Sequence, residues 1–463
     1  MWSCSLANML VFMIVKNSIL NKEIYIDSIN SNFSIDKNEL EYNPYLTNYD
    51  YINLNFDDYK TSSIVFCINL SNGCNLKCDY CFNSKKTGES INFSDVKRFL
   101  DLCFKNFPDK EKYYVDLSGK GEPLLFLKSI LDIKKYCEEI SNKINREVLV
   151  SFVCNGTLLT KEVAELLQRK GILFGVSLDG NELIHNKHRK TKDGNDTYKT
   201  IIDNVNSIPN HEYVGCATTL TKDVFSLIDS IKELSKTFNT IGYKPARNCN
   251  ESFDEDSIDL WLKEYDKLTL FLLEETTKGN DKIIKTLLNG DDYFGKFIKR
   301  IILNQRCLIR CDGGLSRLTL NDDGNIYICP SACDYKKFKV GNLNFIDFNK
   351  QSELFDTQMK RIECSGCSVK YICGGECLIE KTLSNGNNKL MCKYKKHLIL
   401  LAMYFVITLQ SKNNFEFMKL LDFTKEVGSR NKLDKELDKF LKEHPEYNFI
   451  EGKKVFDSLT RKY

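Results

Sequence analysis

The sequence lacks a surplus of either charge. Its 66 Lys and Arg residues are offset by 63 Asp and Glu residues, which leaves a net charge of +3 over 463 residues. Acidic and basic residues are interspersed, without a basic stripe or an acidic tail. Nucleic acids and membrane surfaces bind proteins through such concentrated charge. The composition therefore excludes nucleic acid and a membrane as main partners.

Long hydrophobic runs are also missing. The apolar stretches Met9–Val15 and Leu398–Leu409 are too short to cross a bilayer, which takes about 20 residues, and we interpret the second as a buried helix. No Lys or Arg precedes Lys16, so the start lacks the basic segment of a signal peptide. We therefore expect a cytoplasmic location, which also suits iron–sulfur clusters because these fail in oxidising compartments.

Cysteine, in contrast, is abundant. The chain has 19 cysteines, of which eight lie between Cys307 and Cys377, and Cys392 follows shortly after. Small secreted proteins use such density for disulfides, whereas a large chain without a secretory signal uses it for metal. Hydrophobic residues make up 42% of the chain, which is enough for a substantial core.

Strand-like and helix-like segments alternate from residue 63 onward. The clearest helix is Ser94–Phe107, whose apolar residues recur at helical spacing and for which Ser94 is the expected N-cap. Six strand–helix units predict an α/β fold with a parallel sheet, in the form of a partial (β/α)6 TIM-like barrel. The strands are expected at Ile64–Leu70, Tyr113–Leu117, Val148–Val153, Ile172–Leu178, Tyr213–Thr219 and Thr240–Pro245.

Polar and glycine-rich segments follow the first four of these strands. They are Cys74–Cys81, Ser118–Pro123, Cys154–Thr157 and Ser177–Gly180. In parallel α/β barrels the site lies at the C-terminal ends of the strands. We therefore expect the functional residues to gather at that edge.

The first segment has the spacing Cys-x3-Cys-x2-Cys, formed by Cys74, Cys78 and Cys81. Three thiolates can hold three irons of a 4Fe–4S cube and leave the fourth iron open for a ligand. A zinc site or buried free thiols are the alternatives, although zinc normally takes four protein ligands. The motif, with the aromatic Tyr80 before its last cysteine, resembles the signature of the radical S-adenosylmethionine (SAM) superfamily. The resemblance implies that the open iron binds SAM, which is cleaved to methionine and a 5′-deoxyadenosyl radical.

The same resemblance extends to the other strand ends. Gly119-Lys-Gly-Glu-Pro123 resembles the Gly-Gly-Glu-Pro motif that holds the SAM amino group, with Lys120 as an insertion. Ser177 and Arg189 match positions that bind the ribose and carboxylate of SAM in related maturases, but helix capping and a solvated charge are open alternatives. Asn155 either contacts SAM or is a turn-forming residue. The implied SAM contacts are Tyr80, Gly121, Glu122, Pro123, Asn155, Ser177 and Arg189.

The downstream cysteines have the spacing Cys-x12-Gly-x4-Cys, a gap, then Cys-x2-Cys-x5-Cys-x3-Cys-x14-Cys, and Cys307 precedes them. Eight thiolates suffice for two fully ligated 4Fe–4S cubes, although one zinc ribbon is the alternative. The spacing resembles the cysteine-rich C-terminal SPASM domain and implies two auxiliary clusters, hence three 4Fe–4S clusters in all. By resemblance, the first takes Cys307, Cys311, Cys329 and Cys377, and the second Cys364, Cys367, Cys373 and Cys392.

Eight cysteines stay outside these sets. Cys67, Cys103 and Cys216 fall in strand or helix patterns, so we expect them in the core. Cys333 lies near the cysteine-rich segment and is either an alternative ligand or an active-site thiol.

The resemblance points to peptide or protein modification, with two main branches. Anaerobic sulfatase maturases place an Asp base directly after the cysteine equivalent to Cys329, whereas this chain has Pro330. The other branch matures ribosomally made peptides, often through thioether crosslinks, and we favour it. A carbon–carbon crosslink, an enzyme acting on a small molecule and a non-catalytic metal scaffold stay open.

The implied partners are a precursor peptide with its leader and a flavodoxin- or ferredoxin-type electron donor. Leader binding by β-strand addition is a hypothesis for the N-terminal extension. The expected domains are an N-terminal extension (1–60), the radical SAM barrel (61–250), a helical bridge (251–305), the SPASM domain (306–395) and a helical C-terminal extension (396–463).

Overall fold

The computed structural model describes residues 61–427, apart from 84–87, 89, 304–306, 308, 360–363, 365–366, 368 and 384–387. It also describes the backbone of three N-terminal strands, β1 (Phe12–Asn17), β2 (Lys22–Asp27) and β3 (Asn32–Ser34), which pair antiparallel in that order.

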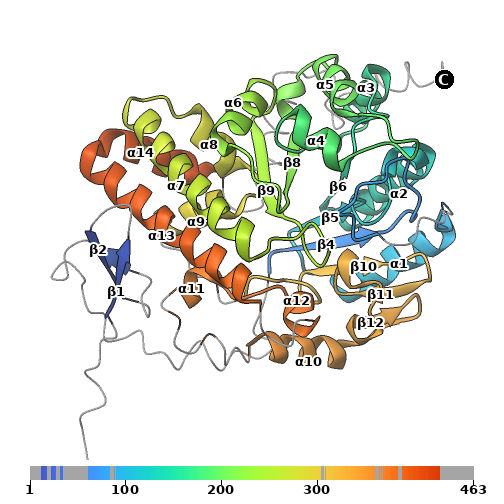
Figure 1. Ribbon diagram of the computed structural model, residues 1–463. Coiled ribbons are helices and arrows are strands. Elements are labelled where there is room, and N and C mark those ends of the chain that lie inside the picture. Colours follow the sequence, from blue (N-terminus) through green and yellow to red (C-terminus); the bar gives the residue numbers. More distant parts are fainter. Residues whose placement is uncertain are drawn as a thin grey trace, which may run out of the picture.

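A parallel sheet of six strands in sequence order forms the centre of the molecule (Figure 1). The expected strands are confirmed, and their ends differ from the expected ones by at most two residues. They are β4 (Ser63–Ile68), β5 (Lys112–Asp116), β6 (Glu147–Cys154), β7 (Ile172–Ser177), β8 (Gly215–Leu220) and β9 (Thr240–Pro245). No pair joins β9 to β4 in the described sheet, so the barrel is partial, as predicted.

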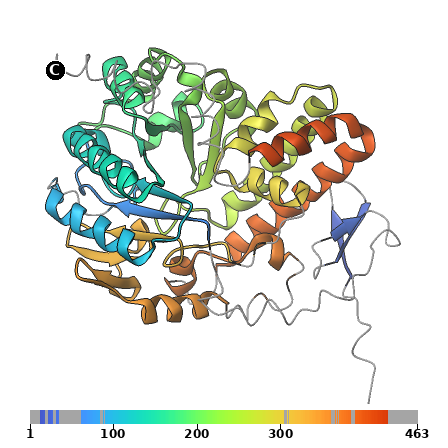
Figure 2. The ribbon, with the colours of Figure 1, turned by 180° about the vertical axis from the view of Figure 1, so that it is seen from behind.

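Helices join these strands and cover the outer face of the sheet, as the two opposite views show (Figures 1 and 2). They are α1 (Phe93–Asn106), α2 (Leu127–Ile144), α3 (Lys161–Arg169), α4 (Glu182–His188), α5 (Tyr198–Asn206) and α6 (Leu227–Thr237). In α1 the predicted apolar face is buried, but the N-cap is Asn92 instead of Ser94, because the Asn92 side chain accepts a hydrogen bond from the Ser94 amide. Gly171 ends α3 with a φ of +59°, a conformation that glycine adopts at little cost.

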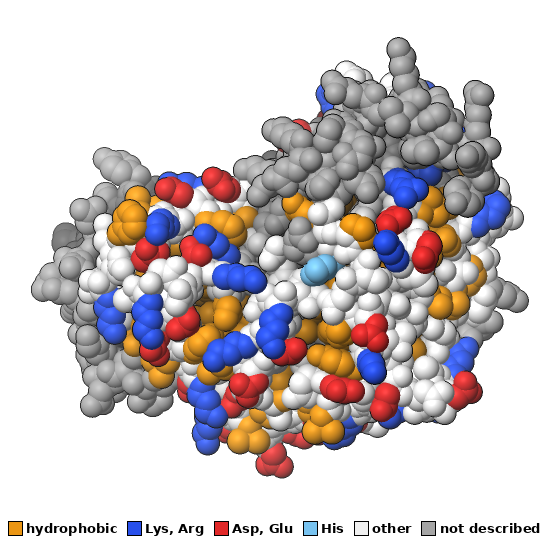
Figure 3. Space-filling model, turned by 90° about the horizontal axis from the view of Figure 1, so that it is seen from above, with side chains coloured by type: hydrophobic (Ala, Val, Ile, Leu, Met, Phe, Trp, Pro, Cys, Tyr) orange, Lys and Arg blue, Asp and Glu red, His pale blue; other side chains and the backbone are white. Residues whose placement is uncertain are grey.

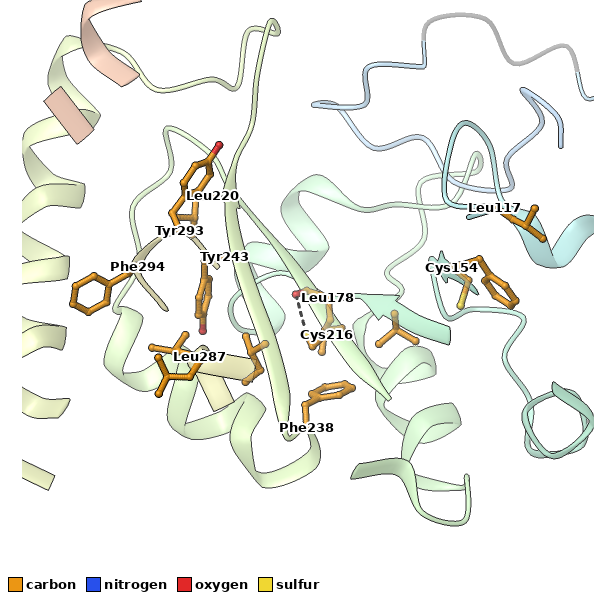
Figure 4. Close-up of a cluster of buried hydrophobic side chains, with 14 of the residues drawn as sticks. Leu117, Cys154, Leu178, Cys216, Leu220, Phe238, Tyr243, Leu287, Tyr293 and Phe294 are labelled. Carbon is orange, nitrogen blue, oxygen red and sulfur yellow. Dashed lines mark hydrogen bonds between the residues drawn. The ribbon is translucent and has the colours of Figure 1, made fainter. Parts of the chain in front are cut away.

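Alternation along the strands separates two apolar groups. Ile64, Phe66 and Ile68 of β4 point outward into the main core, whereas Val65 and Cys67 join a small inner cluster with Tyr114 and Leu149. Cys103 and Cys216 are buried in the main core, as expected. Figure 4 shows Cys216 near Phe238, with its side chain directed at Leu178. The Cys216 sulfur lies 3.7 Å from the Leu178 carbonyl oxygen.

The cysteine-rich segment extends the same sheet, which the sequence did not predict. Strand β10 (Arg317–Leu320) pairs parallel with β4, with Arg317 opposite Val65. Strands β11 (Asn325–Tyr327), β12 (Lys339–Asn342) and β13 (Phe345–Ile346) follow antiparallel, which gives ten strands in the described sheet. The expected boundary near residue 306 therefore does not separate two sheets.

Helices α7 to α9 follow the barrel, and α13 packs on α7 and α9. Leu398–Leu409 lies inside α13 and is largely buried, as predicted. Among the described residues, no helix is long and apolar enough to cross a membrane. The described helices that follow β9 in the chain are α7 (Glu255–Thr277), α8 (Lys282–Asn289), α9 (Tyr293–Ile302), α10 (Phe348–Met359), α11 (Lys370–Cys373), α12 (Leu378–Leu383), α13 (Lys389–Lys412) and α14 (Asn414–Glu426).

Acidic and basic side chains intermingle on the face of the molecule seen in Figure 3. This agrees with the interspersed charges of the sequence, and no large area of one sign appears on that face.

Candidate functional site

The loop after β4 carries Cys74, Cys78 and Cys81. It is held against the end of α4, because the Lys77 amide donates to the Lys190 carbonyl at 2.8 Å and Leu76 forms a β-bridge with Thr191. The pKa of Cys78 is raised to about 11, chiefly by burial; Arg189 lowers it, and the nearby Cys81 and Cys74 sulfurs raise it. The three thiols are thus close enough to interact.

Glu122 joins the β5 loop to the cysteine loop and to β6. Its backbone amide donates to the Gly73 carbonyl at 2.7 Å. Its carboxylate, which is 2% exposed, accepts from the amides of Asn155 at 2.7 Å and Leu124 at 3.0 Å. Burial nevertheless raises its pKa to about 7, since these two hydrogen bonds offset the desolvation only in part.

Gly121 needs to be glycine on two grounds. Its φ is +74°, and a Cβ there would lie 2.4 Å from the Gly73 carbonyl oxygen and 2.5 Å from that of Ser71. The β5 loop can therefore approach the cysteine loop only without a side chain at this position. Pro123 follows as the first residue of a short 3₁₀ helix, Pro123–Phe126.

Asn155 forms the turn that its alternative interpretation predicted. Its side-chain oxygen accepts from the Thr157 amide at 2.9 Å, and its side-chain nitrogen donates to Asn75 at 2.7 Å. Asn75 in turn donates to the Thr157 hydroxyl at 2.8 Å. This network holds the end of β6 against the cysteine loop.

Arg189 is clamped by Asp179, a residue that the predicted site set omitted. Two guanidinium nitrogens contact the Asp179 carboxylate at 2.8 and 3.2 Å, and the guanidinium lies 5.2 Å above the ring of Tyr80. The Tyr80 hydroxyl also donates to Asp179. Burial alone would raise the pKa of Asp179, but the Arg189 guanidinium holds it below its usual range.

Ser177 ends β7 beside this clamp. It does not cap α4, because Asn181 does so by accepting from the Ile184 amide at 3.1 Å. Within the described part of the chain the Ser177 hydroxyl has no hydrogen-bond partner. The capping interpretation of Ser177 is therefore wrong, and its hydroxyl is available to a ligand.

Some of the described C-terminal cysteines lie close enough to influence one another's pKa. Burial and then the Cys377 sulfur raise the pKa of Cys311 to about 11. Burial also raises the pKa of Cys329, and the Cys311 and Cys377 sulfurs add to this rise. Cys307 lies against Gly374, where a Cβ would come within 2.3 Å of its sulfur. Cys373 contributes to the raised pKa of Cys392, an exposed residue whose sulfur lies 3.6 Å from a Glu376 carboxylate oxygen.

The thiol spacing tests the zinc alternatives. A zinc ion with bonds of about 2.3 Å brings tetrahedral sulfurs to about 3.8 Å from one another. Among the described residues, no three cysteine sulfurs lie within 4.8 Å of one another; one group does meet that limit, formed by Asp79, His188 and Glu251.

Lys120, the insertion in the glutamate motif, links the β5 loop to the cysteine-rich segment. Its side chain is 5% exposed, and its ammonium group lies 2.7 Å from Asp334. The neighbouring Cys333 accepts from the Asn69 side chain at 3.3 Å, just after β4. The Cys333 sulfur also lies 3.6 Å from the Cys329 carbonyl oxygen. Cys333 thus lies between the predicted SAM loop and Cys329.

Comparison with known proteins agrees with this geometry. Residues 68–242 match the Radical SAM superfamily. The chain is 24% identical over 350 residues to a cysteine-type anaerobic sulfatase-maturating enzyme of Clostridium novyi, which covers 69% of this chain and 89% of that enzyme. It is 23% identical over 347 residues to the radical SAM cyclopropyl synthase TigE of Paramaledivibacter caminithermalis, covering 68% of each.

The fold is shared with a solved structure described as native anSMEcpe with bound AdoMet. The TM-score is 0.59 at 20% sequence identity, and the alignment covers 76% of this chain and 99% of that chain.

Proposed function

From the premise that this chain is a radical SAM enzyme, we propose that it matures a ribosomally made, Cys-containing peptide by installing a thioether crosslink. The observation that carries this choice is Pro330, the first residue of the 3₁₀ helix Pro330–Ala332 directly after Cys329. Proline has no group that could take a proton from a substrate thiol or hydroxyl. The next carboxylate along the chain, Asp334, is paired with Lys120.

Each part of the site has a role in this proposal. Cys74, Cys78 and Cys81 would hold the cluster that, when reduced, supplies the electron for cleavage of SAM. Glu122, at the end of β5, would accept a hydrogen bond from the amino group of SAM. Ser177 would contact its ribose, and Arg189, held rigid by Asp179, its carboxylate. Tyr80 and Asp179 orient that guanidinium.

The cysteine-rich segment supplies what a crosslinking enzyme needs after hydrogen abstraction. A thioether forms when the substrate sulfur bonds to a carbon radical, and one electron must leave the product. The predicted first auxiliary set lies next to Cys333, close to the β5 loop, so an electron acceptor would stand beside the reacting groups. A flavodoxin- or ferredoxin-type protein would reduce the first cluster.

Sulfatase maturation is the alternative function. The relatives favour it as much as crosslinking, since both cysteine-type and serine-type sulfatase-maturating enzymes are among them. The two functions predict different products, and mass spectrometry of a co-expressed Cys-containing peptide separates them. Leader binding by the N-terminal extension stays a proposal, because most of residues 1–60 lie outside the described part of the chain.

We expect about twelve irons per chain after anaerobic reconstitution, because eleven cysteines are assigned to three cubes. Iron and sulfide analysis measures this directly. Replacing Cys364 with alanine should lower the content by about four irons, whereas Cys249→Ala, outside every predicted set, should leave it unchanged. Bound zinc together with about four irons would contradict the two auxiliary clusters.

We expect SAM affinity to weaken as the pH falls below about 7, because protonation of Glu122 removes the acceptor for the SAM amino group. The weakening should reach about tenfold near pH 6 and should vanish in Glu122→Gln, which binds weakly throughout. Equilibrium binding to the reconstituted enzyme measures both. A parent whose affinity is flat across this range would remove Glu122 from the SAM site.

The free energy of unfolding of the ligand-free enzyme should decrease as the pH rises, whereas SAM affinity should increase. The folded pKa of Glu122 is raised, so its contribution to stability is present at low pH and is lost as the pH rises through about 7. Asp292, the N-cap of α9, is also buried, and its pKa is likewise raised to about 7. Its contribution to stability is therefore also lost as the pH rises. Asp292→Asn is therefore the control that changes the stability slope without touching SAM affinity.

A further inference from the structure

Lys395 is a buried cation with no acidic partner among the described residues. It lies in α13, and the residue is 3% exposed. Its ammonium group donates a hydrogen bond to a backbone carbonyl oxygen, that of Gly375, at 3.2 Å. Lysine is almost never fully buried unless a negative charge lies near it, because removing an ammonium ion from water is costly. A carbonyl dipole does not neutralise a full charge, so Lys395 is an orphaned cation in the described part of the chain.

Two other basic residues of α13 differ from Lys395 in this respect. Lys393 contacts Asp259 at 2.5 Å, and His397 contacts Asp266 at 2.6 Å. Both carboxylates belong to α7, against which α13 packs. The packing of these two helices therefore accounts for the neighbouring basic groups and not for Lys395.

The Lys395 ammonium group lies beside cysteines of the predicted second auxiliary set. The Gly375 carbonyl oxygen that accepts its hydrogen bond also lies 3.7 Å from the Cys373 sulfur. Gly374 and Gly375, with φ of +74° and +88°, turn the chain directly after Cys373, at the end of α11 (Figure 1). Cys392 lies three residues before Lys395 in α13, and this spacing puts both side chains on one face of the helix.

Glu376 is an acidic residue of the same turn. Its carboxylate lies 3.6 Å from the Cys392 sulfur, but among the described residues it forms no ion pair with Lys395. The pKa of Cys392 is raised to about 12, first by burial and then by Glu376, whereas Lys395 lowers it. Lys395 therefore favours the thiolate of Cys392, which is the form that binds iron.

An orphaned cation at this place fits the cluster that the cysteine spacing predicts. A 4Fe–4S cube held by four thiolates has a net negative charge, and reduction adds one more negative charge. A nearby ammonium group compensates the charge of both forms, but it stabilises the reduced form more because that form is more negative. Local charge is one of the factors that set the reduction potential of a cluster.

We propose that Lys395 is the counter-charge of the second auxiliary cluster and raises its reduction potential, so that the electron released by crosslinking passes on from the first auxiliary cluster to the second. The path of that electron rests on the proposed function. In the crosslinking step the substrate carbon radical bonds to the deprotonated substrate sulfur, and one electron leaves the product. From the second cluster the electron would pass to the oxidised form of the flavodoxin- or ferredoxin-type protein.

A redox titration followed by electron paramagnetic resonance tests the proposal without a substrate. The reconstituted protein carries Cys78→Ala, which removes the SAM-cleaving cluster and leaves the auxiliary clusters. The signal that disappears when Cys364→Ala is added belongs to the second auxiliary cluster. Lys395→Gln keeps a hydrogen-bond donor for Gly375 but removes the charge. It should lower the potential of the second cluster by about 60 mV, which is tenfold in the reduction equilibrium for one electron.

Three further variants separate the charge from a structural role. Lys396→Gln, at an exposed position of the same helix, should leave both potentials at the parental values. Lys395→Arg keeps the charge and should stay near the parental potential. Lys395→Met removes the charge and the hydrogen bond, and it should match Lys395→Gln. A fall in potential in Lys395→Met alone would assign the effect to the hydrogen bond and overturn the proposal.

Iron content and circular dichroism show whether each variant is assembled and folded. If Lys395→Gln loses about four irons, their retention in Lys395→Arg supports the proposal, and their loss there as well overturns it. An unchanged potential in fully loaded Lys395→Gln also overturns it, as does a second cysteine set that binds zinc and does not titrate.

These outcomes are distinct from a failure of the proposed function. A lowered potential in Lys395→Gln, together with a co-expressed peptide that carries no crosslink, leaves Lys395 as the counter-charge and contradicts the function. An unchanged potential together with a crosslinked peptide does the reverse.

Discussion

Replacing Cys78 with alanine should abolish formation of 5′-deoxyadenosine from SAM. Two remaining thiols cannot hold three irons of a cube, so the cluster that reduces SAM is lost. The thiol of Cys78 lies near Cys74, Cys81 and Arg189, which all influence its pKa. Chromatographic measurement of 5′-deoxyadenosine with dithionite as the reductant gives the result.

Cys249→Ala is the matched control for this variant. Cys249 is half-buried, its sulfur lies 3.5 Å from the Ser252 hydroxyl, and it belongs to no predicted cluster. It should cleave SAM at the parental rate. Cys78→Ala itself should retain about eight irons, which shows that the auxiliary set is intact. Undiminished SAM cleavage in Cys78→Ala would place the reactive cluster elsewhere in the chain.

A cognate Cys-containing peptide should lose two hydrogens, about 2 Da, for each crosslink that the enzyme installs. One hydrogen leaves as an atom to the deoxyadenosyl radical. The other leaves the thiol as a proton, and its electron goes to an acceptor in the enzyme. The modified Cys should then resist alkylation, because its sulfur is bonded to carbon. Mass spectrometry of the co-expressed peptide before and after alkylation measures both properties.

The product also separates the proposed function from its alternatives. Thioether formation keeps the sulfur, whereas formylglycine formation from Cys removes it and leaves an aldehyde. Loss of sulfur would therefore establish sulfatase-type maturation in spite of Pro330. A carbon–carbon crosslink would show the same mass loss with a Cys that still reacts with the alkylating reagent.

Much of the site could be predicted from sequence because local patterns coincide with the fold. Apolar runs set the six parallel strands, and parallel strands bring their C-terminal ends to one edge. Cys74, Glu122, Asn155, Ser177 and Arg189 were therefore expected together. The structure shows direct contacts between the cysteine loop and the β5 and β6 loops.

Contacts between distant segments escaped the sequence. Asp179 lies within Ser177–Gly180, but nothing local in the sequence shows that it holds Arg189 at 2.8 Å. The pairing of Lys120 with Asp334 depends on β10 joining the sheet beside β4. Pairing of that kind is set by tertiary packing and not by the period of a strand.

The sequence by itself determined the repeating strands and helices, the loops that carry the functional residues and the cysteine spacing, because these depend on residues near one another in the chain. Only the tertiary structure decided which charges share the interior of the barrel. Lys244 and Arg317 lie on β9 and β10, at opposite ends of the parallel strands, and they interact because the sheet curves. Strand twist accumulates over all of those strands, so no single segment of sequence encodes where its two edges meet.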